Sequence, residues 1–284
     1  MFNWSLKLRK QSEFCIPQGP SFNRAEKINF EVDGTEISFC APRHSSHFSS
    51  KEVIQPRKEN RYDHLMMRPY KSYDRRWLYN ALLRRSWGFY GAWLTGYMGE
   101  LSMRVALVTP GELNQGISFF RPKAFENALA DYLQYQYADD IHEGAQKWLA
   151  PLDWQVVNSC ATFYVRANVG NIAAPDRYFL FPISDKHFIE VYFNLHRAGA
   201  GSQEEKDKHI SLSTIEQLST DIINSIQIKL SPEALAQQAK ALEGLEDTQL
   251  SEHFPPMKFT TPEQDAEYEN YLKDELRTQE ILNS

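Results

Sequence analysis

The sequence predicts an α+β fold, in which an antiparallel β-sheet carries helices packed mainly on one face, with an acidic helix at the C-terminal end. Two strand-like runs flank an Asp-Gly pair at 33–34, and apolar and polar residues alternate through 188–195. Segments 122–137 and 213–225 instead carry apolar stripes at helical spacing. We place 1–244 in one α+β domain, and 245–284 in a linker and the acidic helix.

Composition indicates a globular protein that does not span a membrane. The mean hydropathy is -0.53, and no apolar run reaches the length of a membrane span. The first residues lack the pattern of a secretory signal. The cysteines Cys15, Cys40 and Cys160 are odd in number and form no C-x-x-C pair, which favours reduced thiols. We therefore expect a cytoplasmic location.

Charge is unevenly distributed along the chain. The net charge is -6, but residues 1–100 carry a balance of +6 and residues 201–284 a balance of -10. The two ends could attract each other, contact different partners, or form two separately solvated surfaces. The arginines at 75, 76, 84 and 85 point in different directions around the helix expected there, so they form no single basic stripe and nucleic-acid binding is not expected.

The first half of the chain predicts two hairpins separated by a loop and a helix. Asp33-Gly34 joins two strands through a type I' turn. The polar segment 41–68 predicts a long surface loop. Asp74 is the expected cap of a helix over 75–85, whose leucines fall on one arc. A second hairpin is expected from Trp87–Tyr97 and Leu101–Thr109.

The second half predicts further strands and helices in alternation. Pro122 begins a helix that ends near Tyr137, and Ser213 with Glu216 forms a capping box for another. Ser231-Pro232 begins a third helix, which ends near Gly244. The expected strands are Ser118–Phe120, Cys160–Asn168, Tyr178–Ile183, Phe188–Leu195 and Gln227–Leu230, and the acidic helix is expected over Glu263–Leu282.

Two stretches contain candidate binding residues. Gly88 and Gly91 in an aromatic strand suggest a bulge or the close approach of a ligand, so this strand could form the floor of a pocket. The loop residues 43–47 could form its rim. The candidates are Arg43, His44, His47, Trp87, Tyr90, Trp93 and Tyr97. The alternatives are core packing for the aromatic residues and a hydrogen-bonded turn for 43–47. No metal site or cofactor is expected.

The order of elements in the second half resembles that of a known superfamily. Strands at 178–182 and 188–195, a helix at 213–225 and a strand at 227–230 followed by Ser231-Pro232 resemble the closing section of Mog1/PsbP-like proteins. That superfamily includes small bacterial proteins associated with secreted toxins. The resemblance concerns the fold, because no catalytic motif accompanies it.

The sequence therefore favours a non-enzymatic, cytoplasmic protein-binding protein. The observations are the lack of a recognisable catalytic constellation, the acidic C-terminal part and the many Trp and Tyr residues, which serve as binding anchors at interfaces. With the resemblance, this suggests an immunity or chaperone-like partner of a bacterial toxin. The alternative is a small-ligand-binding protein or enzyme with a site near Trp87–Tyr97 and Arg43–His47.

Overall fold

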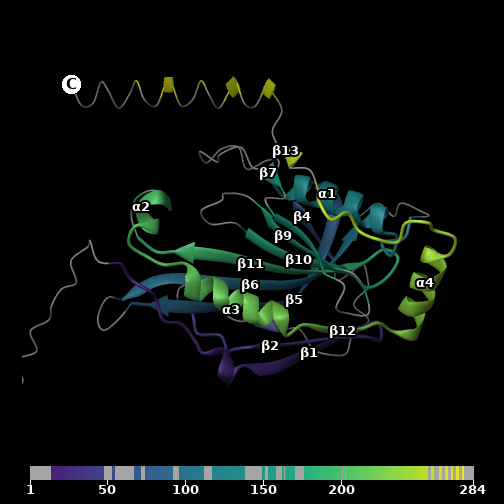
Figure 1. Cartoon of the computed structure of the whole chain (residues 1–284), viewed down its shortest axis with the longest axis horizontal. Coiled ribbons are helices and arrows are strands. Elements are labelled where there is room, and N and C mark those ends of the chain that lie inside the picture. The colour runs from purple at the N-terminus through teal and green to yellow at the C-terminus, as the bar shows by residue number, and fades with distance from the viewer. Residues whose placement is uncertain are drawn as a thin grey trace, which may run out of the picture.

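The computed structural model shows an α+β protein built from antiparallel sheets, which confirms the predicted fold class (Figure 1). It describes residues 14–47, 53–54, 67–71, 74–91, 96–111, 117–137, 149–150, 153–157, 162, 164–169, 176–199, 201, 203–254 and 257–258, together with eight positions between 262 and 277.

In the described part of the chain, the largest element is an eight-stranded antiparallel sheet, here called the large sheet. Its order is β3-β5-β6-β11-β10-β9-β8, and β4 also pairs with β5. The strands are β3 (Val53–Ile54), β4 (Arg68–Lys71), β5 (Asp74–Tyr90), β6 (Tyr97–Pro110), β8 (Asp153–Val157), β9 (Tyr164–Val169), β10 (Asp176–Pro182) and β11 (Phe188–Arg197). Long β6 and β11 pair at its centre from Phe188↔Val108 to Arg197↔Gly99.

Smaller sheets complete the β-structure. The small sheet has the order β1-β2-β12, with β1 at Glu26–Val32, β2 at Thr35–Ala41 and β12 at Gln227–Lys229. Asp33 and Gly34 have φ angles of 49° and 76°, so the two-residue turn between β1 and β2 is of the predicted type I' class. A 3-10 turn η1 (Phe22–Arg24) precedes β1, and β7 (Leu149–Ala150) pairs with β13 (Met257–Lys258).

Apart from the helical positions between 262 and 277, the helices of the described residues are α1 (Pro122–Tyr137), α2 (Gln203–Asp207), α3 (Ser213–Asn224) and α4 (Pro232–Leu242). The predicted cap of α4 is confirmed, because the Ser231 side chain accepts a hydrogen bond from the Ala234 N–H. The predicted capping box of α3 is wrong. Leu212 occupies the cap position without a side-chain bond, and the Glu216 carboxylate accepts a hydrogen bond from Arg177 at 2.7 Å instead.

Helices cover both faces of the large sheet, so the expectation that they pack mainly on one face is wrong. The α1 face packs against Phe125, Leu129 and Leu133 of α1. The opposite α3 face packs against α3 and against the buried side of the small sheet. Figure 1 shows α1 above the large sheet, with α3, β1 and β2 below it. The second cover, built by the small sheet, is a feature that the sequence does not predict.

The helix expected over 75–85 is wrong, because this segment lies within strand β5. β5 pairs with β6 from Trp77↔Pro110 to Tyr90↔Tyr97, and the register shifts between Ala81 and Leu83. A bulge of this kind adds one residue to the strand. Because of the added residue, Leu78, Leu82 and Leu83 have the sequence spacing typical of one face of a helix. The predicted partner strand, Leu101–Thr109, lies within β6.

Three further expectations concern the connections. The strand expected at Ser118–Phe120 is wrong, because Ser118 instead forms a turn in which its carbonyl accepts from Arg121 N–H at 3.0 Å. Most of the loop expected over 41–68 lies outside the described residues. So does most of the acidic helix: the described positions between 262 and 277 are helical and exposed, and a helix over Glu263–Leu282 stays a prediction.

Part of the predicted C-terminal linker packs against the body of the protein. Leu250 is buried in the same cluster as α1, and the Ser251 hydroxyl hydrogen-bonds the Glu126 carboxylate at 3.1 Å. Among the described residues, none of the helices has both the length and the apolar character needed to cross a membrane.

Candidate functional site

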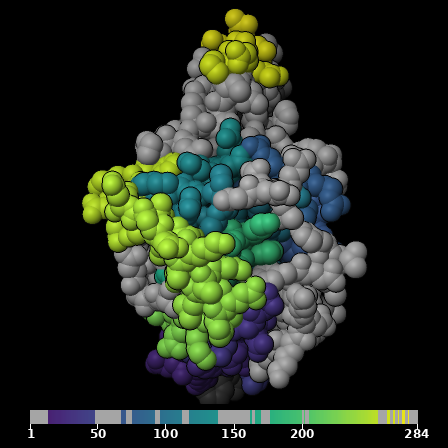
Figure 2. Space-filling model, turned by 90° about the vertical axis from the view of Figure 1, so that its right-hand side faces the viewer, coloured from purple at the N-terminus to yellow at the C-terminus, as the bar shows by residue number. Residues whose placement is uncertain are grey.

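A cleft of about 1080 Å³ lies where β5 begins, β6 ends and α1 begins; we call it the α1 cleft. Segments that are far apart in the sequence form its walls: residues 75–77, 110–111, 117–131, 185–186 and 245–247 all contribute. Figure 2 looks onto the side of the molecule where α4 and the segment after it, in yellow-green, lie beside the teal atoms of α1.

The floor of the α1 cleft is apolar and rigidly packed. Trp77 and Phe119 line it and are almost fully buried. Their rings both contact Phe188 edge-on, with centroids 5.9 Å away in each case. Ile117 also lines the cleft but leaves 58% of its surface exposed. An exposed aliphatic side chain beside a buried aromatic floor gives a partner apolar area to cover.

Asp131 on α1 holds the Trp77 side of the floor in place. Its carboxylate accepts a hydrogen bond from Trp77 Nε1 at 2.8 Å and pairs with the guanidinium of Arg76. The indole N–H and the carboxylate therefore satisfy each other, which a largely buried polar group requires. This arrangement joins the first residues of β5 to α1.

Cations form the rim of the α1 cleft. Arg121 Nε donates to the Ala241 carbonyl at 3.2 Å, and Lys123 Nζ donates to the Ser251 hydroxyl at 2.8 Å. The side chains of Arg75 and Lys186 have no hydrogen-bond or ion-pair partner among the described residues. The five cations that line the cleft (Arg75, Arg76, Arg121, Lys123 and Lys186) outnumber its three carboxylates (Asp131, Asp185 and Asp247), so the rim has an excess of positive charge. The first turn of α1 adds its helix dipole without an acidic residue.

Gly111 allows the mouth of the α1 cleft to close tightly between β5 and β6. Its N–H donates to the Arg76 carbonyl at 2.9 Å. A Cβ atom at this position would lie 1.6 Å from the Arg75 carbonyl oxygen, so no side chain fits without moving the backbone. Gly111 is therefore needed for the close approach of the two strands.

A largely buried polar network, the Glu190 cluster, lies further along the same α1 face. It consists of Tyr70, Arg104, Tyr132, Tyr137, Asp176, Tyr178, Glu190, Tyr192 and Asn194. Glu190 is completely buried at the centre of β11, and Arg104 Nε donates to it at 2.8 Å. The Tyr132 hydroxyl also binds the Glu190 carboxylate, so α1 is fixed to the sheet by hydrogen bonds as well as by packing.

The outer end of the Glu190 cluster is centred on Asp176. This carboxylate accepts hydrogen bonds from Tyr137 at 2.8 Å, and from Tyr192 and Asn194 at 3.0 Å each. Burial raises the pKa of Asp176, and the three hydrogen bonds oppose that shift. Burial likewise raises the pKa of Tyr178 well above its usual value. The cluster keeps its hydroxyls protonated and its donors paired.

The predicted candidates at 43–47 lie in an irregular segment that is hydrogen-bonded to β5. His44 Nδ1 accepts from Ser86 N–H at 3.0 Å, which assigns the ring proton to Nε2 and its bond to the Ser46 carbonyl at 3.1 Å. Arg43 is exposed and pairs with Glu26 at 3.2 Å, and His47 is exposed. The backbone N–H groups of Ser45 and Ser46 donate to the Ser86 carbonyl at 3.0 and 3.1 Å, and a binding role for these residues stays a prediction.

The predicted aromatic candidates separate into buried and half-buried residues. Trp87 is completely buried in the core and donates Nε1–H to the Pro42 carbonyl at 3.1 Å, so its ring forms no pocket wall. Tyr90 and Tyr97 are half-buried and pack edge-on with centroids 6.1 Å apart. Burial, together with Glu100 and Tyr90, raises the pKa of Tyr97 to about 12. Trp93 lies outside the described residues.

Comparisons with known proteins leave the family open. Searches of protein-family models, curated proteins and solved structures find no match to this chain. The resemblance to Mog1/PsbP-like proteins therefore stays a prediction. In the part of the chain that the structure covers, no three His, Cys, Asp or Glu side chains gather as a metal site would require.

Proposed function

We propose that this protein is a binding protein that holds an acidic segment with apolar side chains, supplied by a partner protein, in the α1 cleft. The observation that carries the proposal is the apolar floor of Trp77, Phe119 and Ile117 beneath Arg75 and Lys186, two cations that have no side-chain partner among the described residues. Apolar contacts supply affinity, and the cations select a partner of opposite charge.

A polypeptide suits the size and chemistry of the α1 cleft better than a small metabolite. Its volume of about 1080 Å³ is at the upper end of the range for small-ligand pockets. The described lining contains no Ser, Thr, Cys or His, and Arg76 and Trp77 both engage the Asp131 carboxylate. Its other carboxylates, Asp185 and Asp247, are not accompanied by a described nucleophile such as Ser or Cys. These features favour binding over catalysis.

This role agrees with the immunity or chaperone-like function that the sequence suggests, and a cytoplasmic location is part of the proposal. Cys15 and Cys40 are free thiols, Cys15 being buried, as expected in a reducing compartment. The partner's acidic segment is recognised by its chemistry, so its identity need not be known for a first test.

Fluorescence anisotropy of labelled synthetic peptides tests the proposal. One peptide alternates Glu with Leu and Phe, and a matched peptide carries Lys in place of Glu. We expect the acidic peptide to bind the wild-type protein and the basic peptide not to bind. In the variant R75E/K186E, binding of the acidic peptide should fall by about tenfold or more, because two rim charges change sign.

The matched control is the variant R24E/K240E, which reverses two exposed cations that do not line the α1 cleft. It changes the net charge by the same amount and should bind the acidic peptide like the wild type. An equal loss in both variants would mean that the overall charge, and not the cleft, attracts the peptide. Equal binding of the two peptides, or of neither, would also contradict the proposal.

A further inference from the structure

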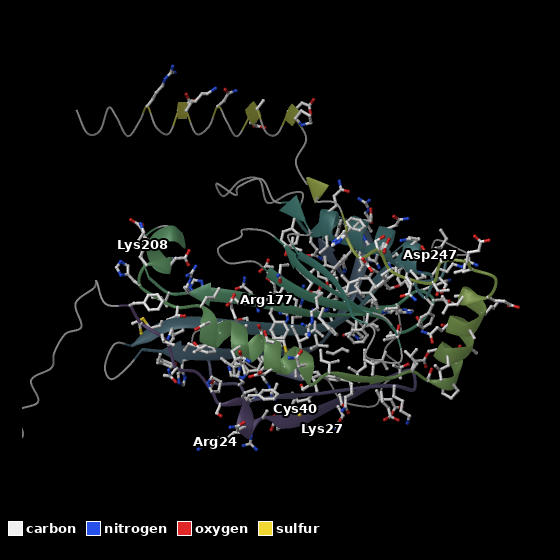
Figure 3. The ribbon with its side chains drawn as sticks, in the orientation of Figure 1. Arg24, Lys27, Cys40, Arg177, Lys208 and Asp247 are labelled. Carbon is white, nitrogen blue, oxygen red and sulfur yellow. The ribbon has the colours of Figure 1, made fainter. Side chains whose placement is uncertain are left out.

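We propose that strand β1 pairs antiparallel with β1 of a second copy of this chain, which joins two small sheets into one continuous sheet across a twofold axis. The surface differs from the α1 cleft, so the inference does not depend on the proposed function. Figure 3 shows Lys27 of β1 at the lower edge of the molecule, far from Asp247 beside the α1 cleft.

The first argument is that β1 has a free edge. In the described part of the structure, β1 pairs with β2 alone, over all seven residues from Glu26↔Ala41 to Val32↔Thr35. The side chains of Lys27, Asn29 and Glu31 alternate with buried residues and are exposed. A strand edge of this length presents unpaired backbone groups, which are a template for another strand.

The turn determines which backbone groups point outward. Val32 and Thr35 flank a two-residue type I' turn, so they form a hydrogen-bonded pair. Hydrogen-bonded and non-hydrogen-bonded pairs alternate along an antiparallel ladder. The N–H and C=O groups of Lys27, Asn29 and Glu31 therefore point away from β2, and no described residue forms a backbone hydrogen bond with them.

The second argument is that the charges on this edge complement themselves. If two β1 strands pair with Asn29 opposite Asn29 of the second copy, Lys27 of each chain lies opposite Glu31 of the other. This register also opposes outward-pointing backbone groups, as a hydrogen-bonded pair requires. A lysine on an edge strand normally prevents pairing, but here it meets a carboxylate twice.

The third argument concerns Glu31 within a single chain. Its partner across the ladder is Glu36, so two carboxylates lie directly opposite each other, an unfavourable arrangement. Lys229 pairs with Glu36 at 2.9 Å, whereas Glu31 has no cationic partner among the described residues. Lys27 of a second copy would supply that missing cation. A second copy therefore fits this edge better than a strand of unspecified sequence.

Sedimentation velocity of the full chain tests the proposal. Over loading concentrations from about 1 µM to 1 mM, the range of weak complexes, the wild type should pass from monomer to dimer. The variants K27E and E31K should each self-associate about tenfold more weakly, because like charges then face each other twice. An equimolar mixture of the two variants should recover the wild-type affinity, because each acidic pair then faces a basic pair.

Asn29→Pro tests the backbone contacts, since it removes an outward N–H that β2 does not use. It should abolish the dimer, whereas Asn29→Ala should retain it, and circular dichroism checks that both are folded. A wild type that stays monomeric throughout would overturn the proposal. So would a dimer in which K27E and E31K self-associate as tightly as the wild type, because pairing would then use another surface.

Discussion

The α3 face of the large sheet is mainly apolar but includes the ion pairs Arg85–Glu26 and Arg177–Glu216, whereas the α1 face combines aromatic packing with the polar Glu190 cluster. On β11 the two chemistries alternate residue by residue: Ile189 and Val191 point to the α3 face, and Glu190 and Tyr192 to the α1 face. The α3 face gains stability from buried area, which tolerates small changes in shape. The stability of the α1 face depends on hydrogen-bond and ion-pair partners in the Glu190 cluster, each of which must be present.

The difference shows how α1 is held at a defined position. Apolar contacts alone allow a helix to repack, but the bonds from Tyr132 to Glu190 and from Trp77 to Asp131 fix its registration on the sheet. The first turn of α1 carries the rim residue Lys123 and contributes to the α1 cleft. The polar layer thus positions the cleft, at the cost of desolvating a carboxylate and a guanidinium.

The largest expected effect comes from removing Glu190. Glu190→Ala leaves Arg104 without its carboxylate partner in a mostly buried site, and should lower the free energy of unfolding by about 3–5 kcal/mol. Urea denaturation measures it. The double variant R104M/E190L removes both charges and should recover most of that loss. If the double variant is as unstable as Glu190→Ala, the unpaired charge is not the cause.

An intermediate effect should distinguish the two faces directly. Tyr132→Phe removes a hydroxyl that binds Glu190 and Tyr70, and should cost about 1–3 kcal/mol because the carboxylate loses a donor. Ile189→Val on the α3 face removes one methylene group and should cost about 0.5–1.5 kcal/mol. Denaturant midpoints compare them. A larger loss for Ile189→Val would mean that area, and not hydrogen bonding, dominates both faces.

The smallest effect should be a change in pH dependence at Asp176. Because burial raises its pKa in the folded state, this group stabilises the fold below its unfolded value near 3.8. That contribution is lost as pH rises through the raised pKa. Asp176→Asn cannot titrate, so its stability relative to the wild type should increase across this window, measured by urea denaturation at a series of pH values. A constant difference between the two proteins would contradict the shift.

Local sequence patterns correctly predicted those elements that are determined by residues close together in the sequence. The Asp33-Gly34 turn, the helix from Pro122 and the Ser231 cap depend on neighbouring residues and are confirmed. The prediction of a helix over 75–85 was wrong because the bulge in β5 breaks the period-two pattern of a strand. Pairing with β6, which local sequence patterns do not show, outweighs the helical spacing of the leucines. The predicted capping box was wrong because the Glu216 carboxylate accepts a hydrogen bond from Arg177, which is far away in the sequence.

The α1 cleft was beyond sequence reasoning for a related reason. Its walls come from five separate segments, so no single motif carries it. One signal was present: the run Ser118-Phe119-Phe120-Arg121-Pro122 places aromatic and cationic residues at the start of a helix. Because the first three of these residues were predicted to form a strand, the cleft at this helix start was not recognised. The predicted candidate Trp87 instead lies in the core, and His44 accepts a hydrogen bond from the backbone of β5.

Gly111 has a consequence for how this protein can vary in evolution. Gly96, unlike Gly111, has a positive φ of 75°, but a Cβ there would meet open space, so Asn, which tolerates this conformation, is an acceptable replacement. At position 111 any side chain collides with the Arg75 carbonyl. A homologue that keeps glycine there can keep the same cleft, whereas one with a larger residue must have moved its strands. Position 111 is therefore a marker by which relatives that share the binding site can be recognised.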